Sequence, residues 1–147
     1  MLTLSRRNGF ENRKGIRQTW MNDSVPGEVI RFLIADAGEG EAIDVQQKLE
    51  EEQAKHGDLV FLHGFIDIYA HIHLKVYGGF EWQQSFCANA EWVLKVDDDA
   101  QGAFATFGAL DGEKIPSNCR PKSAGVFWRN LPPINSSSRS KKPMVIN

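Results

Sequence analysis

The stretch Trp92-Val93-Leu94-Lys95-Val96-Asp97-Asp98-Asp99 joins five residues with the composition of a strand to three consecutive carboxylates. Aspartate is disfavoured inside strands, so we expect the strand to end where the carboxylates begin. In an open parallel sheet, ligands bind outside the carboxyl ends of the strands. Three adjacent aspartates repel one another unless a cation neutralises them, and Mg²⁺ or Mn²⁺ prefers carboxylate oxygens. The stretch therefore indicates either a metal site or a solvated acidic turn.

Two apolar segments that precede this stretch are also predicted strands. They are Val29–Ile34 and Leu59–Leu62, both rich in β-branched or large apolar residues. The segments between the strands have helical patterns, over Glu41–His56 and over Asp67–Ala90. A further short helix is predicted over Asn12–Met21. Strands that alternate with helices predict an α/β fold with a parallel sheet.

The first two predicted helices carry markers of their ends and faces. Asn12 is a candidate N-cap, and Ile16 and Trp20, four residues apart, are expected to face the core. In the second helix, the run Glu50–Glu52 is expected to face water, opposite an apolar face that contains Ala42, Val45 and Leu49. Gly57 is its expected C-cap.

The third predicted helix has an apolar row at i,i+4 spacing. Ile68, Ile72 and Val76 form this row, and the pair Gly78-Gly79 is expected to break or kink the helix. His71 and His73 are two residues apart, so on a helix they point in nearly opposite directions. They are therefore interpreted as surface histidines and not as a metal site.

Length and composition exclude several classes of protein. The chain has 147 residues, a net charge of −2 and 41% hydrophobic residues, which is ordinary for one globular domain. It is neither disordered by composition nor basic enough to suggest nucleic-acid binding. It has no apolar run long enough for a membrane span. Met1–Leu4 resembles the end of a strand and Pro143–Asn147 is an isolated apolar piece, so both ends look cut.

The cysteines and sequons leave the compartment open. Cys87 and Cys119 lack the spacing of a zinc site, and they are either two buried thiols or one disulfide in an oxidising compartment. Asn22 and Asn135 each begin an Asn-x-Ser sequon, which is weak support for secretion.

Six segments, in order, resemble motifs of the β-1,3-galactosyltransferase family (glycosyltransferase family 31). They are Arg13–Trp20 (R-x-x-I-R-x-T-W), Phe32–Ile34 (the family's next strand), Glu52 with His56–Val60 (E-x-x-x-Y-G-D-I-I), Phe65–Tyr69 (D-F-x-D-S-Y), Leu74-Lys75 (L-K-T), and Cys87 with Lys95–Asp99 (C-x-x-x-x-[apolar]-x-K-x-D-D-D). A weaker continuation lies near Trp128-Arg129 and Pro132-Pro133.

The resemblance implies a fold, a reaction and a metal. The implied fold is the GT-A type, a Rossmann-like nucleotide-diphospho-sugar transferase fold, here incomplete. The implied reaction transfers a hexose from UDP-galactose or UDP-N-acetylglucosamine to an acceptor, with inversion and with Mn²⁺. By position, Asp99 would be the direct metal ligand, Asp97 would serve the metal and the nucleotide, and Asp98 would belong to the donor site.

The resemblance also implies four further donor-site residues, each with a structural alternative. One of Arg13 and Arg17 would lie near the diphosphate or the uridine, and the alternative for each is a surface salt bridge. Asp67 would contact the nucleotide, and otherwise caps the helix that follows it. Lys75 is a weaker candidate of the same kind. Lys95 is expected to pair with a neighbouring carboxylate.

The second half of the family pattern has no counterpart in this chain. Residues 1–127 are interpreted as the donor-binding part, and residues 128–147 as the start of the acceptor half, expected to be poorly ordered. No catalytic base can be named, although an inverting transfer requires one. Two hypotheses follow: a hexosyltransferase of which this is the donor-binding part, or an inactive fragment or nucleotide-binding pseudoenzyme.

The resemblance finally implies partners and a location. The acceptor would be a glycan, a glycoprotein or a glycolipid, with no role for nucleic acid. Members of the family are anchored in the Golgi membrane and face its lumen. We therefore expect the parent protein to be membrane-anchored, although this chain contains no anchor segment.

Overall fold

The computed structural model describes residues 1–24 and 26–100 of the chain. Within this part, the strands β1 (Leu2–Leu4), β2 (Arg31–Asp36), β3 (Leu59–Ile66) and β4 (Lys95–Asp97) form one sheet. Every neighbouring pair is parallel, and the strand order is β3-β2-β1-β4. The predicted α/β fold with a parallel sheet is confirmed.

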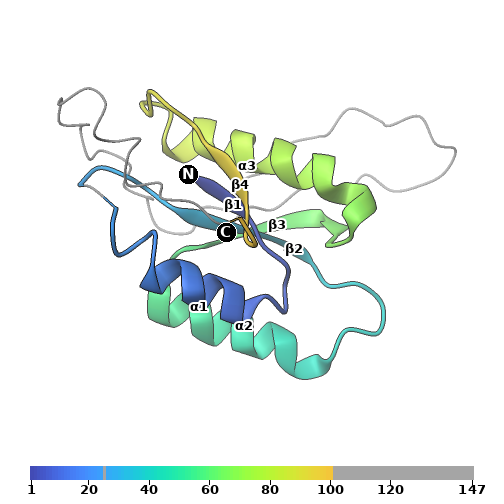
Figure 1. Ribbon diagram of the computed structural model, residues 1–147. Coiled ribbons are helices and arrows are strands. Elements are labelled where there is room, and N and C mark those ends of the chain that lie inside the picture. The colour runs from blue at the N-terminus through green and yellow to red at the C-terminus, as the bar shows by residue number, and fades with distance from the viewer. Residues whose placement is uncertain (25, 101–147) are drawn as a thin grey trace, which may run out of the picture.

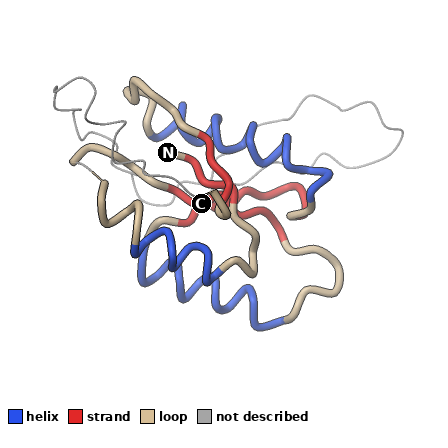
Figure 2. The backbone as a smooth tube through the Cα atoms, in the orientation of Figure 1, coloured by secondary structure: helices blue, strands red, loops and turns tan. Residues whose placement is uncertain are grey.

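Helices cover both faces of the sheet (Figure 1). Helices α1 (Phe10–Gln18) and α2 (Ile43–His56) lie on one face, and α3 (Ile72–Phe86) lies on the other, after the 3-10 turn η1 (Tyr69–His71). Figure 2 shows the same three layers, with the strands between the helices.

Two apolar cores result from these layers. Side chains alternate between the faces of a strand, so Phe32 and Ile34 of β2 pack on the α1 and α2 side. Leu33 and Ala35 pack on the α3 side, together with Trp82 of α3.

The strand order places a topological switch point between β1 and β4. From β1, the chain adds β2 and then β3 on one side, and it then returns to place β4 on the other side of β1. The helices change face at the same step, since α1 and α2 cover one face and α3 covers the other (Figure 1). In open α/β sheets, the carboxyl edge at such a point is where ligands bind.

The first helix begins earlier than predicted. α1 follows Gly9, and Asn12, the predicted N-cap, lies inside its first turn, so that prediction is wrong. The Asn12 side chain instead donates a hydrogen bond to Asp98 Oδ1 at 3.3 Å, across to the end of β4. Ile16 is buried as predicted, whereas Trp20 lies beyond the end of the helix and packs partly against the same core.

The second helix agrees with its predicted end but only partly with its predicted faces. Gly57 is the C-cap, in the left-handed conformation with φ of 66°. Leu49 is fully buried, whereas Val45 is only partly buried and Ala42 is exposed. The prediction that all of Glu50–Glu52 faces water is wrong for Glu52, whose side chain is 9% exposed because it lies against arginines of α1.

The third helix runs without a break through Gly78 and Gly79, which contradicts the predicted kink. Both glycines are buried against the sheet. A Cβ atom at Gly79 would lie 2.4 Å from Leu33 Cδ1. The glycines therefore bring α3 close to the sheet instead of interrupting it.

The predicted apolar face of α3 is also wrong. Ile68 and Ile72 are 44% and 37% exposed, and Val76 is only partly buried. The buried face has helical spacing but mixed chemistry, and its members are Lys75, Gly78, Gly79, Trp82 and Gln83. His73 is exposed as predicted, and His71 is half-buried in η1.

Strand β3 is longer than predicted, and β4 is shorter. The carboxylate of Asp36 accepts a hydrogen bond from the Gly64 N–H at 2.7 Å and pairs with His63 Nδ1 at 2.5 Å, which holds the end of β3 to the sheet. β4 begins only at Lys95, because β1 offers three residues for pairing. Trp92, predicted as part of this strand, is 79% exposed.

Several predictions fall outside the described residues. Cys119, Asn135 and the boundary at residues 127–128 lie there, so those predictions stay predictions. Cys87 is buried, and Asn22 is exposed in a turn. Within residues 1–24 and 26–100, no helix is both long and apolar enough to span a membrane.

Substitution of Gly79 by alanine is expected to destabilise the fold by about 1–3 kcal/mol, because the added methyl group displaces the buried Leu33 side chain. Gly15→Ala is the matched control, since a Cβ at this exposed position in α1 meets nothing within 4 Å. It is expected to stabilise the protein by up to about 1 kcal/mol through helix propensity. Chemical denaturation of both variants measures the difference, and equal shifts would contradict the close approach of α3.

Candidate functional site

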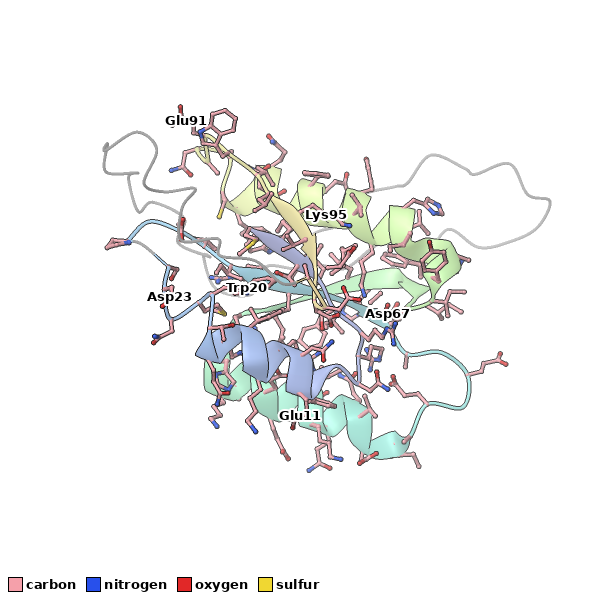
Figure 3. All side chains as sticks on the ribbon, in the orientation of Figure 1. Glu11, Trp20, Asp23, Asp67, Glu91 and Lys95 are labelled. Carbon is pink, nitrogen blue, oxygen red and sulfur yellow. The ribbon has the colours of Figure 1, made fainter. Side chains whose placement is uncertain are left out.

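The carboxyl ends of β1 and β4 lie side by side at the switch point. Leu4 is paired with Asp97, and the Asp98 N–H donates to Leu4 O at 3.1 Å, which extends the pairing by one residue. β3 ends at the same edge, where Asp67 follows it. Figure 3 shows Asp67 toward the end of the sheet where β4 finishes, and Glu91 beyond the end where β4 begins.

The middle residue of the acidic triplet (Asp97–Asp99) faces inward. Asp98 Oδ2 accepts a hydrogen bond from Ser5 Oγ at 2.7 Å, and Oδ1 accepts one from Asn12 Nδ2 at 3.3 Å. Asp97 and Asp99 are exposed. Asp98 and Asp99 lie in a turn that directly follows β4, in which the Ala100 N–H donates to Asp97 O at 3.2 Å.

Two of the three carboxylates are thus open to solvent. Asp97 also contacts Lys95 Nζ at 2.8 Å, which confirms the predicted pairing of Lys95. Within residues 1–24 and 26–100, no three His, Cys, Asp or Glu side chains are grouped so as to hold a metal ion. A divalent cation at a nucleotide site takes one or two carboxylates from the protein and its other ligands from phosphates and water. Asp97 and Asp99 fit a cation shared in this way.

Lys75 reaches the same edge from α3, but its donors are used within the chain. Its Nζ lies 2.7 Å from both carboxylate oxygens of Asp67 and 2.7 Å from Ser5 O. An ammonium group has three donors, which these contacts account for. Burial lowers the pKa of Lys75, although the charges of Asp67 and Asp98 act to raise it. The pair ties α3 to the ends of β1 and β3.

Asp67 is held from a second side as well. Its Oδ2 accepts a hydrogen bond from the Ala35 N–H of β2 at 3.2 Å. Neither η1 nor α3 has a side-chain cap, so the alternative that Asp67 caps the following helix is wrong. Contact of Asp67 or Lys75 with a nucleotide stays a prediction.

Arg13 and Arg17 lie between α1 and α2, and Arg13 also reaches the loop after β1, where its Nη1 donates to Ser5 Oγ at 3.0 Å. Arg13 is fully buried, and its Nε and Nη2 donate to the two oxygens of Glu52 at 2.9 and 2.7 Å. Arg17 donates to Glu52 Oε1 at 2.6 Å and to both oxygens of Asp58 at 2.7 and 2.8 Å. Both arginines form salt bridges, but in a buried network, so the expectation of surface salt bridges is wrong; their contact with a ligand stays a prediction.

The charges in this buried network stabilise one another. Burial raises the pKa of Glu52, but hydrogen bonds from Arg13 and Arg17 lower it by more, so the pKa lies below its ordinary value. Burial lowers the pKa of Arg17, but Asp58 and Glu52 raise it overall. Both shifts favour the charged forms of Glu52 and Arg17.

Sequence reasoning missed three polar residues at this edge. Ser5 directly follows β1, and its position after an apolar strand end is the signal that could have found it. Arg6 is exposed beside it, and its side chain has no ion pair within residues 1–24 and 26–100. His63 pairs with Asp36 at the end of β2. Burial raises the pKa of Asp36, but hydrogen bonds from His63 and the Gly64 N–H bring it below its ordinary value.

Comparison with known proteins agrees with this geometry. The profile of the family described as Galactosyltransferase matches residues 11–134. Human beta-1,3-galactosyltransferase 5 is 30% identical over 100 residues, which cover 67% of this chain and 32% of that protein. UDP-GalNAc:beta-1,3-N-acetylgalactosaminyltransferase 1 of Rattus norvegicus is 34% identical over 102 residues, covering 67% of this chain and 30% of that protein.

A third relative has a different sugar in its name. Human lactosylceramide 1,3-N-acetyl-beta-D-glucosaminyltransferase is 26% identical over 96 residues, which cover 61% of this chain and 25% of that protein. The chain thus spans about a third or less of the length of these curated relatives. The family profile covers most of the chain and confirms the predicted resemblance. The chain belongs to the galactosyltransferase family.

Proposed function

We propose that this chain is the donor-binding part of a hexosyltransferase and that it binds a UDP-sugar together with Mn²⁺. The observation that carries this proposal is the arrangement of the acidic triplet at the switch point, where β4 pairs with the end of β1. Asp97 and Asp99 are exposed there, whereas Asp98 is held inward by Ser5. The relatives support it, because all three are named as transferases of a hexose or an N-acetylhexosamine.

In this proposal Asp99 is the principal metal ligand and Asp97 serves both the metal and the nucleotide. Bound Mn²⁺ would stabilise the negative charge that develops on the departing diphosphate. The chain's own residues supply the carboxylates, and the inward-facing Asp98 leaves its two neighbours directed outward. Arg6, exposed two residues after β1, adds a cation on the loop that leaves this edge.

The acceptor, the inversion and the location are inferred from the family. The acceptor would be a glycan, glycoprotein or glycolipid, and the parent protein would be anchored in the Golgi membrane facing the lumen. An inverting transfer needs a base within hydrogen-bond reach of the acceptor hydroxyl. We assign that role to none of the described residues, so we expect this chain alone to bind the donor without transferring sugar.

A second candidate is a nucleotide-binding protein without transferase activity. The chain covers about a third of the length of its relatives. This partial coverage favours nucleotide binding without transfer for the 147 residues themselves. Turnover of UDP-galactose by the purified chain would exclude it.

Calorimetric titration of UDP into the chain, with and without Mn²⁺, tests donor binding. We expect UDP binding to require Mn²⁺. Loss of a residue that only supports a metal ligand typically weakens metal binding by about 10–100-fold, so Asp99→Ala, which removes a direct ligand, should weaken UDP binding by at least this factor. Asp23→Ala is the matched control, because it removes the same charge from an exposed turn far from the triplet in sequence. Equal affinity with and without Mn²⁺, or in both variants, would contradict the proposed site.

A further inference from the structure

We infer that Ser5 is a positioning residue for the acidic triplet: by binding Asp98, it directs Asp97 and Asp99 toward the ligand. The inference rests on the proposed function for the identity of that ligand, a UDP-bound divalent cation. It assigns Asp98 a role different from that of its neighbours. Asp98 would act through the positions of Asp97 and Asp99, without itself touching metal or nucleotide.

Ser5 is fixed in place by all of its polar groups. It is 2% exposed. Its N–H donates to Leu33 O at 3.3 Å, and its carbonyl oxygen accepts from Lys75 Nζ at 2.7 Å. Its hydroxyl accepts from Arg13 Nη1 at 3.0 Å and donates to Asp98 Oδ2 at 2.7 Å. A hydroxyl has one proton to donate, so the short contact to Asp98 defines its orientation.

The Ser5 hydroxyl also connects the buried Arg13–Glu52 pair with the acidic triplet. Arg13 binds Glu52 with one side of its guanidinium and Ser5 Oγ with the other. The inward carboxylate of Asp98 therefore has two cations nearby, Arg13 behind the Ser5 hydroxyl and Lys75 behind the Ser5 carbonyl. These two cations attract the carboxylate, which is consistent with the inward position of the middle aspartate.

The loop after β1 lies close to the Asp98 carboxylate, and Gly9 permits this approach because it has no side chain. A Cβ atom at Gly9 would lie 3.0 Å from Asp98 Oδ2 and 3.1 Å from Ser5 Oγ. The Asp98 N–H is held at 3.1 Å from Leu4 O, at the last step of the β1–β4 pairing. The backbone and the side chain of Asp98 are thus both held, in the turn that also contains Asp99, while the side chains of Asp97 and Asp99 are exposed.

The test is the variant Ser5→Ala in the full 147-residue chain, with Ser24→Ala as the matched control. Ser24 Oγ donates one hydrogen bond, to Met21 O at 2.8 Å, in a turn remote from the sheet edge in sequence. We expect Ser5→Ala to weaken UDP binding in the presence of Mn²⁺ by about 10-fold or more. We also expect it to alter the electron paramagnetic resonance spectrum of the bound Mn²⁺. Ser24→Ala should change neither.

A second pair of measurements separates positioning from general destabilisation. Ser5→Ala added to Asp98→Ala should weaken binding no further than Asp98→Ala alone, because Ser5 acts through Asp98. Amide exchange of Asp98 and Asp99 should become faster in Ser5→Ala than in Ser24→Ala. Unchanged affinity and exchange in Ser5→Ala, or additive effects in the double variant, would overturn the inference. If the unaltered chain does not bind UDP with Mn²⁺, the proposed function fails, and amide exchange still decides whether Ser5 positions the triplet.

Discussion

Replacement of Arg13 by methionine is expected to cost about 3–5 kcal/mol of folding stability. Arg13 is 0% exposed, and its donors satisfy Glu52, the Ser5 hydroxyl and the carbonyl oxygens of Arg6 and Arg7. Methionine keeps most of the volume but leaves these acceptors without their donors. Removing one partner of a buried ion pair is costly because the other remains buried and less compensated.

Urea denaturation of Arg13→Met and Lys14→Met measures this effect against a neighbour on the same helix. Lys14 is 61% exposed and contacts Glu11 Oε2 at 3.5 Å. Its replacement is expected to change stability by less than about 0.5 kcal/mol, as for most surface substitutions. The free energy of unfolding of a native protein is about 5–15 kcal/mol. The Arg13→Met variant should therefore be partly unfolded at elevated temperature. Similar midpoints for the two variants would show that the network contributes little.

This network also shows where sequence reasoning reaches its limit. The run Glu50–Glu52 has the composition of a solvated helix face, and Glu50 and Glu51 are exposed as predicted. Glu52 is turned inward only because α1 brings Arg13 and Arg17 against it from 39 and 35 positions earlier in the chain. Local periodicity contains no information on such a long-range contact.

The strands and their direction were predictable because they depend on local composition. The apolar segments before Asp36 and Asp97 are strands, and their parallel arrangement follows from the helices between them. The failures concern α3, where the buried face contains Lys75 and Gly79. Periodicity of apolar residues overlooks a lysine whose stem is buried and a glycine that permits close approach.

The location of the candidate site was predicted, but the different surroundings of its three aspartates were not. The acidic triplet lies at the carboxyl edge, as an apolar strand followed by aspartates indicates. That Asp98 faces inward depends on Ser5 and Asn12, more than eighty residues earlier in the chain. Three identical residues thus have different surroundings, which no one-dimensional pattern distinguishes.

Replacement of Lys75 by methionine is the second large expected effect, again about 3–5 kcal/mol. Lys75 and Asp67 are 6% and 13% exposed, and their charges are each other's closest partners. Asp67→Asn alone should destabilise for the same reason, since it leaves the buried ammonium without a counter-charge. Each single change removes the attraction between the charges but keeps the desolvation of the charge that remains.

The double variant Lys75→Met/Asp67→Asn should recover most of that loss. Replacing both members of a buried ion pair is often neutral, because the desolvation of both charges disappears with their attraction. The amide oxygen of the substituted side chain can still accept the Ala35 N–H that Asp67 Oδ2 accepts now. Urea denaturation of the two single variants and the double variant at neutral pH gives the interaction free energy between the side chains of Lys75 and Asp67. Additive losses would show that the two side chains stabilise the fold independently.

The pH dependence of stability supplies an independent check on the same pair. Burial lowers the pKa of Lys75 below its ordinary value of 10.5, despite the opposing charge of Asp67. The unfolded chain therefore binds more protons than the folded chain between the lowered pKa and 10.5, so stability should rise with pH across that interval. The double variant lacks Lys75, so the unaltered chain should gain stability relative to it as the pH rises through the same interval. A difference that stays constant up to pH 10.5 would contradict the lowered pKa. Unchanged affinity of the double variant for UDP with Mn²⁺ would show that neither side chain contacts the nucleotide, whereas a loss could also arise through Ser5, whose carbonyl oxygen Lys75 holds.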